Sequence, residues 1–380
     1  MDFIKVAAAC PITRVADIEY NLENILLCLD EAYENKSKAI VFPELCVTSY
    51  SCGDLFLQYT LLEKANLAIS KIIEKSSNLD MLIAVGAPLN FKNVLFNCAY
   101  IIFNGKLLGI VPKSYIPNYS EFYEKRWFSE GLGIIDEKVD FDFQKDVPFG
   151  TNLIFNSGKY TFGFEVCEDL WVTIPPSSHL SLLGANIIGN LSASNELVSK
   201  KDYREALISN QSARCMSAYI YSSAGVHEST TDLLFSGHLL IAENGTMLKE
   251  NERFQRDNQV IYSYIDIFRL NSERLKNISY RDASRITPFD AKIINFNYKE
   301  NNIDNFDRYI DKHPFVPSNT IQREERCKEI FNIQASALAK RLEHTNLKKA
   351  VIGISGGLDS TLALLVVVKT FKLLGIDIKI

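Results

Sequence analysis

The chain has 380 residues, with 41 lysines and arginines against 46 aspartates and glutamates, and therefore a net charge of −5. This length favours two domains or one large one, and the acidic balance argues against non-specific nucleic-acid binding. No apolar run approaches the roughly 20 residues that span a bilayer, and eight scattered cysteines without a Cys-x-x-Cys pair disfavour a disulfide framework or a zinc site. We therefore expect a cytoplasmic protein without a membrane segment or a bound metal in its structural core.

The first 275 residues alternate apolar, strand-like runs with amphipathic helices, a pattern that is typical of layered α/β folds. The elements predicted at the start of the chain are a strand over 3–9, a helix over 17–34, a strand over 39–42, a helix over 59–76 and a strand over 81–87. We expect the helices to cover a sheet, because their apolar residues recur on one helical face.

Further along the chain, some of the predicted strands are joined by tight turns and not by helices. Asn104-Gly105 joins two apolar runs, and both residues favour the positive φ that a two-residue hairpin requires. Asn244-Gly245 predicts a similar hairpin. Hairpins inside and helices outside indicate mixed sheets, and two such sheets packed face to face would form a four-layer α-β-β-α sandwich.

The periodicity fades over 276–320, which we interpret as a connector between a first domain, 1–275, and a second domain, 321–380. In the second domain the pattern predicts a long helix, a strand over 350–354, a glycine turn, another helix and a final apolar segment over 375–380. This part of the sequence looks like the opening β-α-β unit of a doubly wound domain. Because one such unit cannot bury both faces of its strand, we expect this domain to be the incomplete start of a larger one.

Three reactive side chains follow apolar runs, where predicted strands end: Glu44, Lys113 and Cys167. Clefts beyond strand ends are the usual ligand sites of α/β sheets. Alone, a buried cysteine is usually a small hydrophobe, and a glutamate or lysine is usually a solvated charge. Together they form a complete set, because the cysteine can attack as a thiolate, the glutamate can take its proton and the ammonium can stabilise an oxyanion.

The segments around these residues are Phe42–Leu45, Val111–Tyr115 and Glu165–Asp169. In order and context they resemble the three signature segments of the nitrilase (carbon–nitrogen hydrolase) superfamily. The resemblance covers roughly residues 1–270. It implies the four-layer sandwich, a catalytic triad of the three residues above and no cofactor for this half of the chain.

The same resemblance implies a second glutamate shortly after the lysine, placed to orient the nucleophile or the substrate. Glu121 is our first candidate and Glu124 the next. Either residue could instead be a charge on the surface of a helix or loop.

Residues 352–360, Ile-Gly-Ile-Ser-Gly-Gly-Leu-Asp-Ser, lie between a predicted strand and a predicted helix. Glycines allow the tight turn, and the helix N-terminus favours an anion such as phosphate. No lysine follows as in a Walker motif, so P-loop hydrolysis of ATP is not expected. The string resembles the pyrophosphate loop of the N-type ATP pyrophosphatases, whereas the alternative is an ordinary glycine-rich turn. The resemblance implies that ATP, with Mg²⁺ for the complete domain, binds at Ser355, Gly356, Gly357, Asp359 and Ser360.

A nitrilase-type domain followed by such a loop resembles the glutamine-dependent NAD synthetases. Segments that agree with that family are Thr48–Phe56, Tyr119–Glu124, Asn190–Ser194 and Glu228–Asp232. The resemblance implies an enzyme, active as a homo-oligomer, that hydrolyses glutamine through a cysteine thioester and passes the ammonia to deamido-NAD, activated by ATP, to give NAD. The glutamine contacts that it implies are Tyr50, Tyr119, Glu168 and Ser194, with Ser192 as the alternative to Ser194.

The sequence leaves two other functions open. The first is a stand-alone nitrilase-type amidase that acts on another small amide. The second is an assembly module in which the triad is present but does not act. For the glutamine-dependent enzyme the expected partners are the small molecules glutamine, deamido-NAD and ATP, and neither nucleic acid nor a membrane is expected.

Overall fold

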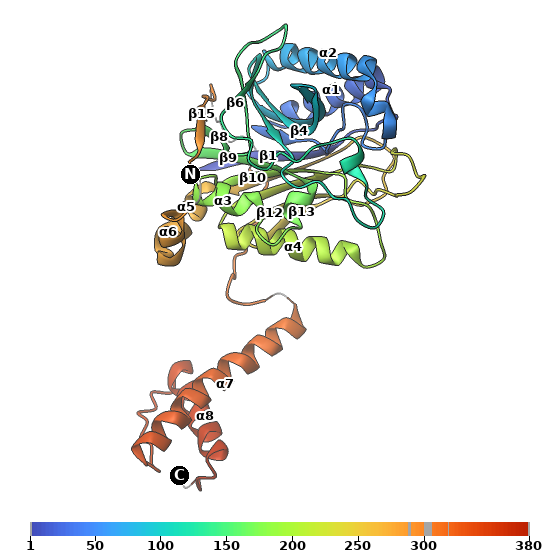
Figure 1. Ribbon diagram of the computed structural model, residues 1–380. Helices are drawn as coiled ribbons and strands as arrows, with labels where there is room; N and C mark the ends of the chain where they lie inside the picture. The colour runs from blue at the N-terminus through green and yellow to red at the C-terminus, as the bar shows by residue number, and fades with distance from the viewer. Residues whose placement is uncertain (1, 288–289, 300–305, 318, 379–380) are drawn as a thin grey trace. The chain divides into compact units, whose positions relative to one another are not determined.

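The computed structural model of the chain describes residues 2–287, 290–299, 306–317 and 319–378. They fall into two units, Met1–Arg308 and Tyr309–Ile380. The described part of the first unit contains two β-sheets with helices against them (Figure 1). Both sheets contain parallel and antiparallel pairs, so the predicted α/β class with mixed sheets is confirmed.

The first sheet holds the strands that precede Glu44 and Lys113. Its strands are β1 (Phe3–Cys10), β2 (Ala39–Val41), β3 (Leu82–Phe91), β4 (Val94–Phe103), β5 (Lys106–Pro112), β6 (Glu137–Val139), β7 (Val147–Phe149) and β14 (Gln259–Asp266). Their order is β14-β1-β2-β3-β4-β5-β7-β6. β2 pairs parallel with β3, and β3, β4 and β5 pair antiparallel in turn. β2 and β5 therefore run in the same direction and end at the same edge of the sheet.

The second sheet holds the strand that precedes Cys167. Its strands are β8 (Leu153–Ser157), β9 (Tyr160–Val166), β10 (Ile187–Ser192), β11 (Ala218–Ser223), β12 (Leu239–Glu243), β13 (Thr246–Glu250) and β15 (Lys292–Asn295). Their order is β13-β12-β11-β10-β9-β8-β15. The central strands β9, β10 and β11 are parallel, so the residues after β9 and β10 leave the sheet at the same edge.

Both predicted Asn-Gly hairpins are present. Asn104 and Gly105 have φ angles of 47° and 75° between β4 and β5, and Asn244 and Gly245 have φ angles of 45° and 84° between β12 and β13. The two central residues of such a turn need positive φ so that the turn matches the twist of the strands.

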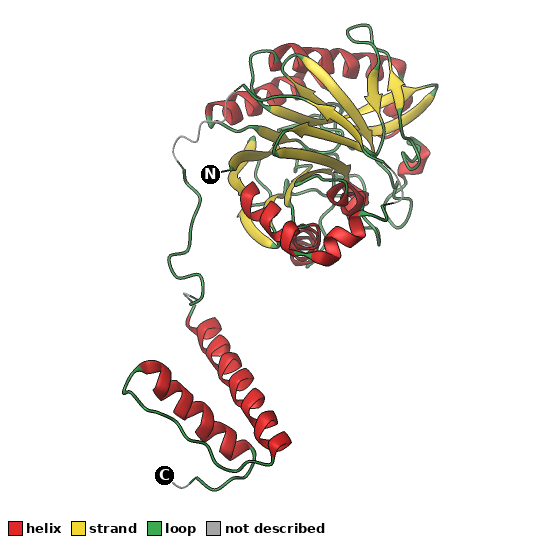
Figure 2. Cartoon of the chain, turned by 90° about the vertical axis from the view of Figure 1, so that its left-hand side faces the viewer, coloured by secondary structure: helices red, strands yellow, loops and turns green. Residues whose placement is uncertain are grey.

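Helices cover the outer faces of the sheets, as the red and yellow elements of Figure 2 show. The helices of this unit are α1 (Ile18–Glu34), α2 (Tyr59–Ser76), α3 (Pro176–Leu182), α4 (Lys200–Cys215), α5 (Ile267–Lys276) and α6 (Ile278–Ser284). One apolar cluster joins α1 and α2 to the first sheet, a second lies between the two sheets, and a third joins the second sheet to α3 and α4. Burial of apolar surface in the second cluster holds the two sheets against each other.

The segment predicted as a connector, 276–320, is in part an element of the first unit. It contributes α6, and it contributes β15, which pairs parallel with β8. Arg308, the last residue of the first unit, is attached to it because its guanidinium donates to both carboxylate oxygens of buried Glu243 at 2.6 Å. The periodicity did not reveal β15 because this short strand is only partly buried.

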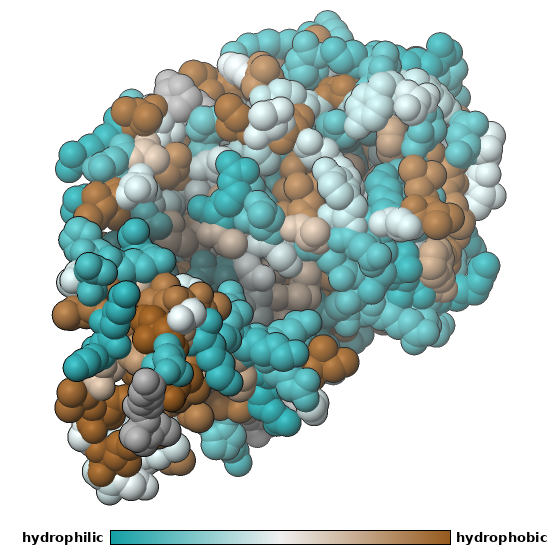
Figure 3. All heavy atoms as spheres, turned by 90° about the horizontal axis from the view of Figure 1, so that it is seen from below, coloured by the Kyte–Doolittle hydropathy of each residue, from teal (hydrophilic) through white to brown (hydrophobic). Residues whose placement is uncertain are grey.

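The described part of the second unit consists mainly of α7 (Thr320–Thr345) and α8 (Leu358–Leu373). The strand predicted over 350–354 is wrong: within the described residues of this unit there is no strand, and Val351 is 100% exposed. A strand needs a neighbour for its N–H and C=O groups, and these residues find none. Apolar side chains therefore remain on the surface of this unit, as the brown residues at the lower left of Figure 3 show. In the described part of the chain, no helix is both long and apolar enough to cross a bilayer.

Candidate active site

Glu44 lies at the edge of the first sheet and is the third residue after the end of β2. The chain turns sharply here: Leu45 has a φ of 52°, and a Cβ atom on Gly86 would lie 2.3 Å from the Leu45 nitrogen. Only a glycine at 86 allows this approach. The backbone N–H of Glu44 donates to the carbonyl of Ser192 at 3.2 Å, which ties the first sheet to the second.

The carboxylate of Glu44 is fully buried, and one of its two oxygens accepts hydrogen bonds. Its Oε1 accepts hydrogen bonds from Asn97 Nδ2 at 2.5 Å and Lys113 Nζ at 2.6 Å. Its Oε2 has no hydrogen-bond partner among the described residues. A buried acceptor without a donor is unfavourable, so this oxygen is free to receive a proton.

Lys113 follows β5 and lies, fully buried, between two carboxylates. Its Nζ is 2.6 Å from Glu44 and 2.8 Å from Glu124, and Glu124 also accepts a hydrogen bond from the Tyr50 hydroxyl at 2.7 Å. Burial lowers the pKa of Lys113, but the charges of Glu124 and Glu44 outweigh it and raise that pKa well above its usual range. Lys113 is therefore a permanent ammonium.

The structure brings Glu124, and not Glu121, to the lysine. Glu121 instead accepts a hydrogen bond from Asn195 Nδ2 at 2.5 Å. Burial raises the pKa of Glu124, and Lys113 opposes this shift. Of the two candidates left by the sequence, Glu124 is the one placed to orient the ammonium.

Cys167 is the first residue of a short 3-10 helix, Cys167–Leu170, directly after β9. Its φ of 45° is unusual for a residue with a side chain, and such strain is common where a nucleophile is presented. The thiol is buried, and the backbone N–H of Ala193 donates to its sulfur. Burial raises the thiol pKa well above its usual range, the charge of Glu44 raises it further, and Lys113 lowers it. The resting group is thus a neutral thiol that needs a base in order to react.

Asp169, which the sequence analysis did not single out, joins the turn that carries Cys167 to the segment that carries Lys113. Its carboxylate accepts hydrogen bonds from the backbone N–H groups of Val166 at 3.0 Å, Ser114 at 3.2 Å and Tyr115 at 2.9 Å. Burial raises its pKa to about 8, against the opposing effect of these donors. One side chain thereby fixes the spacing between the ends of β5 and β9.

A cavity of about 220 Å³ opens in front of the thiol. It is lined by Pro117, Tyr119, Ser120, Glu121, Phe122, Cys167, Glu168, Trp171, Ser194, Leu197 and Lys200. Three of the four residues predicted to contact glutamine, Tyr119, Glu168 and Ser194, thus lie around the cavity, whereas the alternative Ser192 is not one of the lining residues. Ser192 Oγ donates instead to Asn190 at 2.7 Å.

The cavity carries charges of both signs. Tyr119 donates its hydroxyl to both oxygens of Glu168, at 2.9 and 3.0 Å. Lys200, which the sequence analysis missed, donates to Asn195 and lies 5.1 Å from the centre of the Trp171 ring. Burial lowers the pKa of Lys200 and raises that of Glu168. Each charge is therefore incompletely compensated within the protein.

Tyr50, the fourth residue predicted to contact glutamine, lies beside Glu124. Its hydroxyl is engaged by Glu124, and its ring lines a neighbouring cavity of about 210 Å³ together with Trp127 and Phe235. It supports the carboxylate behind Lys113 and does not line the cavity of Cys167.

The predicted phosphate loop lies at the N-terminus of α8. Gly356 has a φ of 84°, Gly357 is the residue before the helix, and the hydroxyls of Ser355 and Ser360 lie 3.4 Å apart. A glycine is needed at 356, since other residues rarely adopt this φ. The loop is exposed, and its geometry suits a phosphate group.

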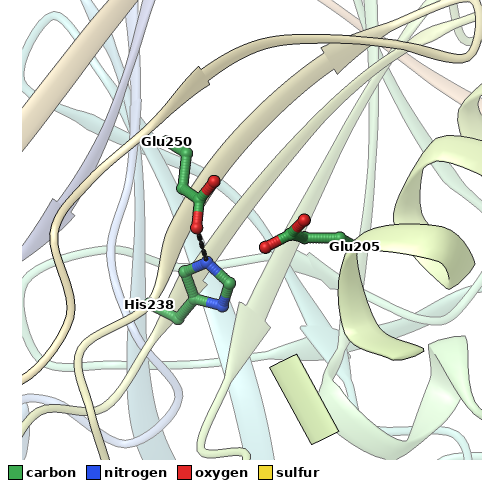
Figure 4. Close-up of side chains that lie close together, drawn as sticks. All are labelled: Glu205, His238 and Glu250. Atoms are coloured by element: carbon green, nitrogen blue, oxygen red, sulfur yellow. Dashed lines mark hydrogen bonds and ion pairs between the residues drawn. The ribbon is translucent and has the colours of Figure 1, made fainter. Parts of the chain in front are cut away.

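A second group of polar side chains consists of Glu205, His238 and Glu250, none of which lines the cavity (Figure 4). It resembles a metal site, but its hydrogen bonds do not fit one. Arg204, which has only donors, lies 2.8 Å from His238 Nδ1, so the proton is on Nε2, which donates to Glu250 at 3.0 Å. Lys201 Nζ also contacts Glu205 at 2.8 Å and Glu250 at 3.0 Å. The group is a hydrogen-bonded ion cluster with a neutral imidazole.

This imidazole predicts an acid-sensitive fold. Burial, aided by the charge of Arg204, lowers the pKa of His238 from 6.5 to about 3. Between these values the unfolded chain binds a proton that the folded chain does not, so stability falls as the pH falls. We expect His238 to remove about 2 kcal/mol from the free energy of unfolding between pH 7.5 and pH 5. Both tryptophans lie in the first unit, so urea unfolding followed by tryptophan fluorescence measures this change.

The matched variant is His238→Gln, whose amide can accept from Arg204 and donate to Glu250 without titrating. Between pH 7.5 and pH 5 the free energy of unfolding of this variant is expected to fall by about 2 kcal/mol less than that of the wild type. Equal losses in both proteins would contradict the assignment of a buried, neutral His238.

Comparison with known proteins identifies the family of the chain. Residues 5–273 match the family model of the carbon–nitrogen hydrolases. The glutamine-dependent NAD(+) synthetase of Mycobacterium leprae is 36% identical over 378 residues, which are 96% of this chain and 54% of that protein. The chain thus spans about half the length of the curated relatives that it matches.

Solved structures show the same relationship. The crystal structure of a glutamine-dependent NAD(+) synthetase from Cytophaga hutchinsonii is 28% identical and superposes with a TM-score of 0.64, over 70% of this chain and 43% of that one. The ADP complex of the glutamine-dependent NAD+ synthetase from Acinetobacter baumannii is 22% identical, with a TM-score of 0.60 over 97% of this chain and 57% of that one, and shows likeness of fold alone. Because the family model matches residues 5–273, the chain belongs to the carbon–nitrogen hydrolase family, and over nearly its whole length it is similar to glutamine-dependent NAD(+) synthetases.

Proposed function

We propose that the first unit hydrolyses the side-chain amide of glutamine through a thioester on Cys167. The observation that carries this proposal is the buried Lys113 ammonium, which lies 2.6 Å from Glu44 and 2.8 Å from Glu124. The charges of these three residues all affect the pKa of the Cys167 thiol. An acid–base pair beside a neutral thiol supplies the parts that amide hydrolysis requires.

In the first step Glu44 Oε2 takes the thiol proton while sulfur bonds to the amide carbon and the carbonyl electron pair moves to oxygen. Lys113 and backbone N–H groups stabilise this oxyanion. Glu44 then returns the proton to nitrogen as the C–N bond breaks and ammonia leaves. Water, deprotonated by Glu44, attacks the thioester, the C–S bond breaks, the thiol is reprotonated and glutamate departs.

Glutamine suits the charges of the cavity. Its α-ammonium would pair with Glu168, and its α-carboxylate would pair with Lys200, with Ser194 as a further hydrogen-bonding group. Because burial disfavours both protein charges, a zwitterion that compensates them gains more than a neutral amide does. Tyr50 and Glu124 would hold Lys113 in place from behind.

We further propose that the ammonia serves the ATP-dependent amidation of deamido-NAD to NAD, as in the enzymes that the chain resembles. Ser355, Gly356, Gly357, Asp359 and Ser360 would hold the phosphates of ATP, with Mg²⁺ as the counter-charge. The exposed N-terminus of α8 and the hydroxyls at 3.4 Å support this assignment. In this proposal the first unit is a nitrilase-type four-layer sandwich, and the second unit belongs to a doubly wound nucleotide-binding domain.

The test is ammonia release from glutamine, asparagine and simple aliphatic amides. Glutamine is expected to give the highest kcat/KM. The variant Lys200→Met is expected to raise the KM for glutamine about 10- to 100-fold, the worth of a charged hydrogen bond, with little effect on an amide that has no carboxylate.

Lys201→Met is the matched control, since Lys201 is the next residue on α4 and does not line the cavity. It is expected to behave as the wild type. Equal turnover of all amides would favour a stand-alone amidase with another substrate. A protein that releases no ammonia, and whose Cys167 resists a diazoketone analogue of glutamine, would favour a non-catalytic assembly module.

A further inference from the structure

Arg204 is the largest fully buried side chain of the structure's described residues, and it lies on α4, the helix that also carries the lining residue Lys200. It is not one of the residues that line the cavity. A buried guanidinium is unfavourable unless hydrogen bonds compensate its charge. Its partners therefore indicate what the residue is for.

The guanidinium contacts three consecutive residues after β10. Nη2 donates to Ser194 Oγ and to the Asn195 carbonyl, each at 3.3 Å, and Nη1 donates to Glu196 Oε1 at 2.8 Å. The segment 194–196 is thereby fixed to the N-terminal half of α4. Planar guanidinium donors impose direction as well as charge, which an ammonium does not.

The same segment forms the wall of the cavity. Ser194 lines it directly, and the side chain of Asn195 binds two further lining residues, Glu121 at 2.5 Å and Lys200. The residue before Ser194, Ala193, donates its N–H to the sulfur of Cys167. A shift of this segment would therefore move both the pocket cation and a donor to the nucleophile.

We propose that Arg204 is a positioning residue for substrate binding, which acts through Ser194 and Asn195 to hold the cavity wall and Lys200 in place. This inference rests on the proposed function, because it concerns recognition of the amino-acid end of glutamine.

His238 orients Arg204 without adding charge. Its Nδ1 accepts from Nη1 at 2.8 Å, and its Nε2–H donates to Glu250 at 3.0 Å. Figure 4 shows the ring pointing at Glu250, with the carboxylate of Glu205, from α4, beside that of Glu250. An imidazole that accepts on one side and donates on the other fixes the guanidinium in one orientation.

The experiment compares two electrophiles that alkylate Cys167, in a Cys327→Ser background that removes the exposed thiol. A diazoketone analogue of glutamine needs the whole cavity, whereas iodoacetamide needs only the thiol. We expect Arg204→Lys to lower the labelling rate of the diazoketone by about tenfold or more, as for a lost charged hydrogen bond, and to change that of iodoacetamide by less than about threefold. The KM for glutamine is expected to rise by a similar factor, with a smaller change in kcat.

Arg253→Met is the matched control, because Arg253 also pairs with Glu196, at 2.9 Å, but lies outside the cavity lining. It is expected to leave both rates unchanged. As a second variant His238→Leu, which removes the acceptor of Arg204 without touching the cavity, is expected to slow the diazoketone selectively, whereas His238→Gln is not.

A merely structural role would lower the melting temperature but leave the ratio of the two rates unchanged, and that result in both Arg204→Lys and His238→Leu would overturn the inference. If the wild type shows no preference for the diazoketone analogue over a diazoketone without the amino-acid group, the proposed function fails, and this inference fails with it.

Discussion

Replacing Cys167 by alanine is expected to abolish glutamine hydrolysis, with a loss of at least about 10⁴-fold in kcat, as for other enzymes that lose their nucleophile. The reason is that no thioester can form, and among the described residues that line the cavity Cys167 supplies the thiol. Glu44, Lys113 and Glu124 remain in place, so the variant isolates the nucleophile. Ammonia release at saturating glutamine measures the loss.

The fold is expected to survive this change, because the side chain is small and the surrounding ion pairs do not depend on it. The matched control is Cys215→Ala: Cys215 is also buried, burial raises its pKa to about 11, and it contacts Ser177 and Gln211 away from the cavity. Cys215→Ala is expected to retain wild-type turnover. Substantial hydrolysis by Cys167→Ala would contradict the proposed mechanism.

The parts of the fold that depend on local pattern could be predicted from the sequence. The helices expected over 17–34 and 59–76 form as Ile18–Glu34 and Tyr59–Ser76, since the amphipathic period and the flanking polar residues are local signals. The Asn-Gly hairpins form for the same reason. By contrast, the strand expected over 350–354 depends on a partner strand, which local sequence does not encode.

The site divides in the same way. Glu44, Lys113 and Cys167 could be singled out because each follows an apolar run and the surrounding segments resemble a known family. Glu121 and Glu124 are three residues apart in an irregular segment, and only the packing of that segment decides which one turns inward to Lys113.

Residues whose role depends on distant partners were missed. Asp169 accepts from a segment more than fifty residues away in the chain, and Lys200 is the first residue of a polar helix that resembles any surface helix. The sequence suggests that Arg204 is a solvated charge on that helix, but its side chain is fully buried. A weak signal was available for Arg204, since Ile208 and Ser212 follow at four-residue steps and are buried on the same face.

Replacing Lys113 by methionine is expected to have the second large effect, on stability as well as activity. Lys113 is the ammonium between Glu44 and Glu124, all three side chains being buried at 0–3% exposure. Removing it leaves two buried carboxylates without their cation, which is expected to lower the free energy of unfolding by about 3–5 kcal/mol. Hydrolysis is expected to fall by about 10³-fold, because the oxyanion loses its charged donor. Urea unfolding and ammonia release measure the two effects.

A double variant separates these effects. Lys113→Met with Glu124→Gln removes one of the unpaired carboxylates, so it is expected to recover about half of the lost stability without restoring hydrolysis. Lys38→Met is the control for loss of a less buried pair: Lys38 lies 2.6 Å from Asp80, the two side chains are 15% and 13% exposed, and the pair lies outside both cavities. The free energy of unfolding of Lys38→Met is expected to fall by about 1 kcal/mol, with unchanged activity.

Two results would contradict these expectations. If the double variant were no more stable than Lys113→Met, the ammonium of Lys113 would not stabilise the fold by compensating the charges of Glu44 and Glu124. If the double variant hydrolysed glutamine, Lys113 would be needed to hold the fold and not to stabilise the oxyanion.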